Sequence, residues 1–114
     1  MPHAYEAIVL LRDAGAVIES AIGDLERYCR GITRYEGHYE LDFETATATI
    51  RVEDGSLLIR VLAEVVVDNE GSKALIVSHI HKHAKCMPAN LLWVAGSDEP
   101  FDAIVSRNAA KNDF

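Results

Sequence analysis

The side chains best suited to chemistry lie in one segment, residues 78–86, which reads SHIHKHAKC. This segment holds three of the five histidines and one of the two cysteines. Imidazole and thiolate groups are good ligands for Zn²⁺, and on a helix His79 and His83 are one turn apart, so their side chains can meet. Cys86 follows three residues later and can extend the same helical face. A metal site formed by His79, His83 and Cys86, with Zn²⁺ as the ion, is therefore one interpretation.

The same residues also fit a helix end that carries no site. Pro88 cannot continue a helix, so this segment should lie at a helix C-terminus. Cationic side chains there interact favourably with the helix dipole, by about 0.3–1 kcal/mol each. The cationic or titratable side chains in question are His81, Lys82, His83 and Lys85. On this interpretation His79 is a partly buried, hydrogen-bonded histidine, and no metal is involved.

Acid–base catalysis is the third interpretation. His79 could pair with the carboxylate of Asp42 or Glu40 and form the dyad of a small hydrolase or isomerase. Cys29 or Cys86 could act as a nucleophile beside a histidine. The sequence has no nucleophile elbow, no phosphate-binding glycine loop and no flavin or nicotinamide fingerprint. We therefore expect a non-enzymatic protein and assign no catalytic or cofactor-binding residue.

Length and composition indicate one globular domain. The chain has 114 residues, of which 49% are hydrophobic and 25% charged, enough to form a core. A formal net charge of -7 disfavours binding to nucleic acids or to anionic membranes, because both need a cationic surface. No apolar run approaches the roughly 18 residues that span a bilayer, and no signal peptide is apparent. We expect a cytoplasmic protein whose two cysteines form no disulfide.

Two segments show helical periodicity. Residues 14–30 follow Asp13, a possible cap, and Gly31 lies where a C-terminal helix cap is common. The apolar positions of this segment that repeat every three or four residues are Ile18, Ile22, Leu25, Cys29 and Ile32. A second helix is predicted to begin after Asp68 or Asn69 and to run to about residue 84. Its apolar face comprises Leu75, Ile76, Ile80 and Ala84.

The remaining segments alternate between apolar and polar residues, as strands do. Strands are predicted over residues 4–11, 38–43, 46–53, 57–63 and 90–95. Asp54 and Gly55 separate the third and fourth of these runs, and such a pair is a strong hairpin signal. The fourth run has a possible extension through three consecutive valines, residues 65–67, because β-branched residues favour extended backbone.

These elements predict an α+β fold in the order β-α-β-β-β-α-β, followed by a short helix. We expect a two-layer sandwich in which a mainly antiparallel sheet carries two helices on one face. The domain should cover residues 1–96, and residues 97–114 should form an extension with a short helix and a frayed tail. The valines at residues 65–67 would form an apolar edge that needs cover, which favours a homodimer.

Three segments resemble a family of small bacterial proteins without established activity, which occur alone or fused ahead of siderophore-interacting, FAD-dependent ferric-chelate reductase domains. Residues 25–29 are similar to its first-helix pattern of a leucine and a cysteine. Residues 50–61 resemble its central hairpin. Residues 78–84, with the strand around Trp93, resemble its histidine-containing helix end and final strand. The resemblance covers about residues 5–95.

This resemblance implies an accessory role in iron or siderophore handling, with a flavin-dependent ferric-chelate reductase as a possible partner. The sequence departs from the family pattern at two histidine-related positions. Gly31 stands where the family often has a histidine after the first-helix cysteine, and His83 stands at an aromatic position. Residues 64–69 are longer than usual and the tail after Ala95 is additional. If two family histidines act together, only His79 remains here.

Overall fold

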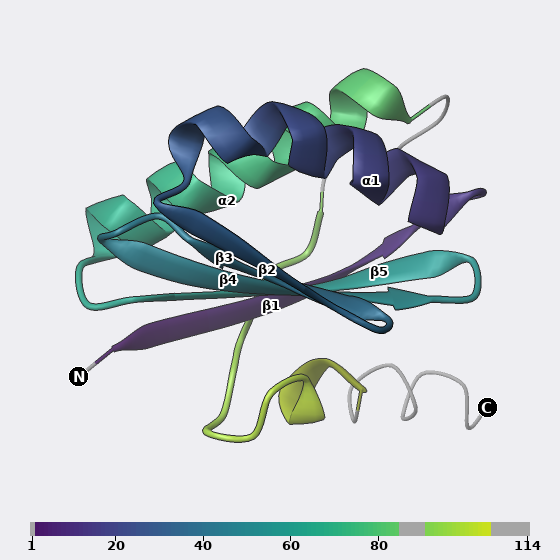
Figure 1. The fold of residues 1–114 in the computed structure, drawn as a ribbon. Helices are drawn as coiled ribbons and strands as arrows, with labels where there is room; N and C mark the ends of the chain where they lie inside the picture. Colours follow the sequence, from purple (N-terminus) through teal and green to yellow (C-terminus); the bar gives the residue numbers. More distant parts are fainter. Residues whose placement is uncertain (1, 85–90, 106–114) are drawn as a thin grey trace, which may run out of the picture.

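The structure is a computed structural model that describes residues 2–84 and 91–105. A six-stranded antiparallel sheet has the strand order β2-β3-β4-β5-β1-β6, and both helices lie on one of its faces (Figure 1). The elements are β1 (His3–Leu10), α1 (Ala14–Leu25), η1 (Glu26–Tyr28), β2 (Gly31–Tyr35), β3 (His38–Asp42), β4 (Ala46–Glu53), β5 (Ser56–Ala63), α2 (Val66–His83) and β6 (Val94–Ala95). The predicted α+β class, with two helices on one face of an antiparallel sheet, is confirmed.

The core lies between the helices and the sheet. Alternate residues of β1, β4 and β5 point to the helices, as the period of a strand requires. The fully buried apolar residues of this layer include Val9, Ile50, Leu57, Ile59 and Val61 from the strands and Ile18, Ile22, Leu25, Ile76 and Ile80 from the helices. Each such side chain contributes about 1.5–3 kcal/mol on burial, so this layer provides most of the driving force for folding.

The hairpin predicted at Asp54 and Gly55 is confirmed. Glu53 pairs with Ser56, which leaves a two-residue loop between β4 and β5. Gly55 has φ 78°, a left-handed conformation that glycine adopts without strain. The loop fixes the register of the two central strands and so places their apolar residues on the helix side.

The first helix is shorter than predicted. It ends at Leu25 and continues as one 3-10 turn, after which Cys29 is extended with φ -106° and ψ 144°. Gly31 is therefore the first residue of β2 and no helix cap, and the sheet has one strand more than the predicted order. Ile32 misled the prediction because it extends the helical spacing of α1. In the structure it pairs with Leu41 of β3 and packs against the same core from a strand.

The three consecutive valines do not extend β5. Val65 is extended, but α2 begins at Val66, and all three side chains are exposed, Val67 by 76%. Asn69, a predicted cap, is instead buried in the helix face and donates a hydrogen bond of 2.8 Å from Nδ2 to the carbonyl oxygen of His3. The side chain thereby joins α2 to the start of β1. The helix begins before both predicted caps, after Val65, and has no side-chain cap.

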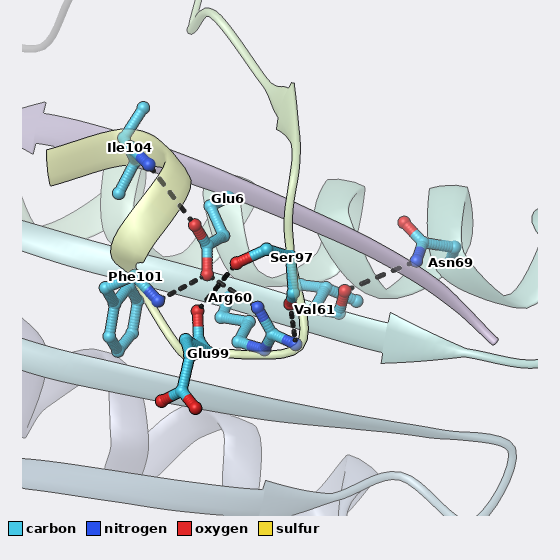
Figure 2. Close-up of polar contacts among 8 residues, drawn as sticks. All are labelled: Glu6, Arg60, Val61, Asn69, Ser97, Glu99, Phe101 and Ile104. Carbon is cyan, nitrogen blue, oxygen red and sulfur yellow. Dashed lines mark hydrogen bonds and ion pairs between the residues drawn. The ribbon is translucent and has the colours of Figure 1, made fainter. Parts of the chain in front are cut away.

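The segment after β6 passes to the face of the sheet opposite the helices (Figure 1). Residues 102–105 are helical, and Phe101 and Ile104 pack on Leu58 in a second small core. Figure 2 shows how Glu6 holds this segment: its carboxylate accepts the backbone N–H groups of Phe101 at 2.5 Å and Ile104 at 3.4 Å. Residues 97–105 of the predicted extension therefore contact the sheet closely.

A buried ion pair completes this contact. Arg60 Nη1 lies 2.7 Å from Glu6 Oε2, and Arg60 Nη2 donates to the carbonyl oxygen of Ser97 at 2.8 Å. The pair is shielded from water because Glu6 is 0% exposed. Within residues 2–84 and 91–105, no helix is both long and apolar enough to cross a membrane.

Candidate functional site

The C-terminal ends of α1 and α2 meet at one carboxylate. Oδ2 of Asp24 lies 2.7 Å from Nε2 of His83, 3.0 Å from Nζ of Lys82 and 3.5 Å from Nδ1 of His79. We call these four residues the Asp24 cluster. The i, i+3 and i+4 spacing on α2 brings the three cationic or titratable side chains to one side of the helix. The cluster ties the two helices together at the end of the molecule that contains His83.

The cluster stabilises the ionised form of Asp24. The hydrogen bond from His83, followed by that from Lys82, lowers the pKa of Asp24 far below its usual value of 3.8. The carboxylate is therefore ionised under all ordinary conditions. The ring of Tyr28 packs against His79, with 5.6 Å between the ring centroids. His79 is thus partly buried between an aromatic ring and a carboxylate. The helix-end interpretation also predicted that it is hydrogen-bonded, but within the described residues its buried Nδ1 atom has no hydrogen-bond partner.

The carboxylates proposed for a catalytic dyad lie elsewhere. Asp42 pairs with Arg30 at 2.9 Å, and Glu40 lies 3.9 Å from His38. Both alternate with the buried Leu41 on β3 and so point away from the helices. The prediction that Asp42 or Glu40 pairs with His79 is wrong, because the carboxylate at His79 is Asp24. No local pattern indicated this partner, which is 55 positions away on another helix.

The structure describes two of the three predicted metal ligands. His79 and His83 do approach the same oxygen, but Cys86 lies outside the described residues. In the described part of the chain, no group of three or more histidine, cysteine, aspartate or glutamate residues could hold a metal ion. Lys82 already places a cation 3.0 Å from the oxygen that both histidines approach. His81, which is exposed, is not part of the cluster.

A cleft of about 770 Å³ opens beside the Asp24 cluster. We call it the α1 cleft. Its apolar lining consists of Leu10, Leu11, Ala16 and Val17, and its polar lining consists of Arg12, Asp13, Ser20 and His83. His83 therefore belongs both to the cleft and to the cluster, so that Asp24 fixes the position of a side chain in the cleft wall.

The rim of the α1 cleft has an unusual backbone. Asp13 immediately precedes α1 and has φ 54°, a left-handed conformation that is uncommon for residues other than glycine, asparagine and aspartate. This turn brings Arg12 and Asp13 to the cleft before the chain enters α1. Asp13 occupies the predicted cap position, but its side chain forms no cap hydrogen bond. The sequence did not predict the site because Asp13 was interpreted as a helix cap and Arg12 was given no role.

A second, smaller hollow lies on the sheet face opposite the helices. It has a volume of about 510 Å³ and is lined by β2, β3 and β4. Its polar lining residues are Thr33, Glu40, Asp42, Thr47 and Thr49. At the end of this surface the rings of Tyr35 and His38 stack, with 4.4 Å between their centroids. We call this surface the threonine face. Its apolar lining consists of Leu41 and Ala48 and is smaller than that of the α1 cleft.

Comparison with known proteins supports the fold and leaves the activity open. No protein-family model matches the sequence, and no curated protein matches it. The fold is similar to the NMR structure of PA4090 from Pseudomonas aeruginosa, with a TM-score of 0.68 and 9% sequence identity. The match covers 81% of this chain and 95% of that one. At this identity the similarity concerns the fold alone.

Proposed function

We propose that the chain is a small non-enzymatic module that binds a ligand in the α1 cleft. The observation that carries the proposal is the cleft itself, whose volume of about 770 Å³ falls in the range typical of small-molecule sites. Such sites combine an apolar wall with a few polar groups that orient the ligand. Leu11 and Val17 provide the wall here, and Arg12, Ser20 and His83 provide polar groups.

The arrangement of His83 supports binding over catalysis. Its Nε2 atom is directed to Asp24, which holds the ring in place. Ser20 is the hydroxyl side chain that lines the same cleft. In the described ranges no hydrogen bond joins this hydroxyl to His83, although a nucleophile activated by a histidine needs one. The histidine therefore serves better as part of a binding surface than as a base.

The family resemblance suggests the biological setting. We propose that the module acts in the cytoplasm as an accessory in iron or siderophore handling, with a flavin-dependent ferric-chelate reductase as its partner. Isothermal titration calorimetry of the chain against a purified reductase of this kind tests the partnership. Saturable binding in the micromolar range supports it, and a dissociation constant weaker than about 1 mM contradicts it.

Self-association is a further proposal, supported by the three exposed valines at residues 65–67. An apolar patch of this kind often marks a protein interface. Light scattering after gel filtration should give twice the monomer mass, and Val67→Lys should give the monomer. A monomeric wild-type chain at 100 µM, roughly the concentration at which weak dimers form, would contradict the proposal.

Ligand binding in the α1 cleft can be tested with N-phenyl-1-naphthylamine, a neutral apolar dye that fluoresces in apolar surroundings. Wild-type protein should bind it saturably. Ala16→Trp places a large ring in the cleft and should weaken binding by about tenfold or more. Ala74→Trp is the matched control, because Ala74 is also an exposed helical alanine but lies on α2 outside the cleft. Equal binding by both variants, or no saturable binding by wild type, would refute the proposal.

A metal-binding function is the second candidate, because His79 and His83 approach one oxygen atom of Asp24. Native mass spectrometry of protein prepared without a histidine tag would show one Zn²⁺ per chain if His79, His83 and Cys86 form a site. His83→Ala should then lose the ion. Metal-free protein whose melting temperature does not respond to added Zn²⁺ rules this function out.

A further inference from the structure

We propose that the ligand of the α1 cleft is a small zwitterion with an apolar body, of the α-amino acid class. Arg12 would contact its carboxylate and Asp13 its ammonium group. This inference rests on the proposed function, since it assigns a ligand class to the same cleft.

The two charges at the rim carry the inference. Arg12 and Asp13 both line the cleft, and both are exposed. Within the described ranges neither side chain forms an ion pair, whereas Arg30, Arg34, Arg51 and Arg60 do. A guanidinium group and a carboxylate that line the same cleft without pairing offer one contact to an anionic group and one to a cationic group.

The charges of the Asp24 cluster, which adjoins the cleft, are already matched. Asp24 is neutralised by Lys82 and is hydrogen-bonded to His83, so the cluster adds no strong net field at the cleft wall. The ligand charges therefore have Arg12 and Asp13 as their partners. A ligand with equal and opposite charges is also compatible with the whole molecule. The chain carries a formal net charge of -7, which repels a simple anion and leaves a neutral zwitterion unaffected at long range.

The lining between the charges defines the rest of the ligand. Leu11 and Val17 are buried apolar residues at the cleft, so a hydrocarbon or aromatic body is favoured next to them. Ser20 lies further along α1, and His83 lies at the end of α2. Each can accept or donate one hydrogen bond. An apolar amino acid, alone or at the end of a larger compound, combines these features.

Three matched probes test the charge assignment: L-phenylalanine, 3-phenylpropionate, which lacks the amine, and phenethylamine, which lacks the carboxylate. Affinities can be measured by displacement of N-phenyl-1-naphthylamine. L-Phenylalanine should bind about tenfold more tightly than either analogue, as expected for one additional charge-assisted contact. Arg12→Gln should reduce its affinity to that of phenethylamine, and Asp13→Asn to that of 3-phenylpropionate.

Two features of the variants keep the test clear. Asparagine tolerates the left-handed backbone of residue 13, so Asp13→Asn removes the charge without strain. Arg27→Gln is the control for Arg12→Gln, because Arg27 is exposed on η1 outside the cleft and the charge change is the same. Arg27→Gln should bind all three probes as wild type does.

The outcomes separate this inference from the function on which it rests. If the dye binds in the cleft but the three probes bind equally, or none displaces it, the zwitterion assignment is refuted and the ligand-binding function stands. If Arg27→Gln weakens L-phenylalanine as much as Arg12→Gln does, the assignment to Arg12 is refuted. If neither the dye nor any probe binds, both the function and the inference fail.

Discussion

Nε2 of His83 lies 2.7 Å from Oδ2 of Asp24, so the last turn of α2 is joined to the last turn of α1. The contact connects the two helices near their C-terminal ends and places His83 in the wall of the α1 cleft. The stability of the helix pair and the shape of the cleft thus depend on the same carboxylate.

Asp24→Asn should destabilise the protein in a pH-dependent manner. The folded-state pKa of Asp24 is lowered, so the stability it provides is fully present above its unfolded value of 3.8 and decreases as the pH falls below it. The difference in unfolding free energy between wild type and variant should shrink as the pH falls from about 5 toward 3, a range below that in which histidines ordinarily change charge. Urea unfolding at these pH values provides the measurement. A difference that grows between pH 5 and pH 3 would contradict this account.

Removal of the buried Glu6 carboxylate should be among the most damaging single substitutions. Glu6→Ala leaves the charge of Arg60 buried without a partner and frees the N–H groups of Phe101 and Ile104. A loss of about 3–5 kcal/mol is expected for a broken buried pair. The double variant Glu6→Leu with Arg60→Met should recover part of this loss, because no charge is then left unpaired. Urea unfolding of wild type, Glu6→Ala and the double variant tests the coupling. Equal losses of unfolding free energy in the single and double variants would disprove it.

Two glycine substitutions should have opposite effects. A Cβ atom at Gly96 would lie 2.9 Å from Nη1 of Arg60, so Gly96→Ala should displace the guanidinium and cost about 1–3 kcal/mol. Gly23 lies within α1 and a Cβ atom there meets no neighbour within 4 Å. Gly23→Ala should therefore stabilise the protein by about 0.5–1 kcal/mol through helix propensity. Thermal unfolding distinguishes the two, and destabilisation by both would contradict the predicted environments.

The thiol of Cys29 should be unreactive at neutral pH. Burial, and then the charges of Asp42 and Glu26, raise its pKa to about 11. In a Cys86→Ser background, the rate of alkylation by iodoacetamide should rise with a midpoint near the folded value, and near 9.0 in urea. Because the unfolded thiol ionises first, protein stability should fall as the pH rises from 9.0 to about 11. A folded-state midpoint at or below that in urea would exclude the described environment.

Local patterns predicted the parts of the fold that depend on local chemistry. The DG pair predicted the hairpin, and the spacing of Ile18, Ile22 and Leu25 predicted the buried face of α1. The predicted end of that helix was wrong because Ile32 continues the helical spacing of α1 and also lies on the core side of β2. Periodicity cannot separate these two roles when the strand that follows is only five residues long.

The contacts that define the candidate site join residues far apart in the sequence. His79 and His83 were recognised from their one-turn spacing, but nothing near them pointed to Asp24. The role of Glu6 could not be predicted either, because its partner Arg60 is on another strand and lies 54 positions later. Such pairs follow from strand order and helix packing, which a single sequence does not provide at the level of individual side chains.

The most direct test of the ligand-binding account is chemical-shift mapping of ¹⁵N-labelled protein during titration with N-phenyl-1-naphthylamine. The account predicts saturable changes that are largest at the amides of Ala16, Val17, Ser20 and His83, around the α1 cleft. Changes centred on Thr33, Thr47 and Thr49 of the threonine face, or the absence of any saturable change, would contradict it.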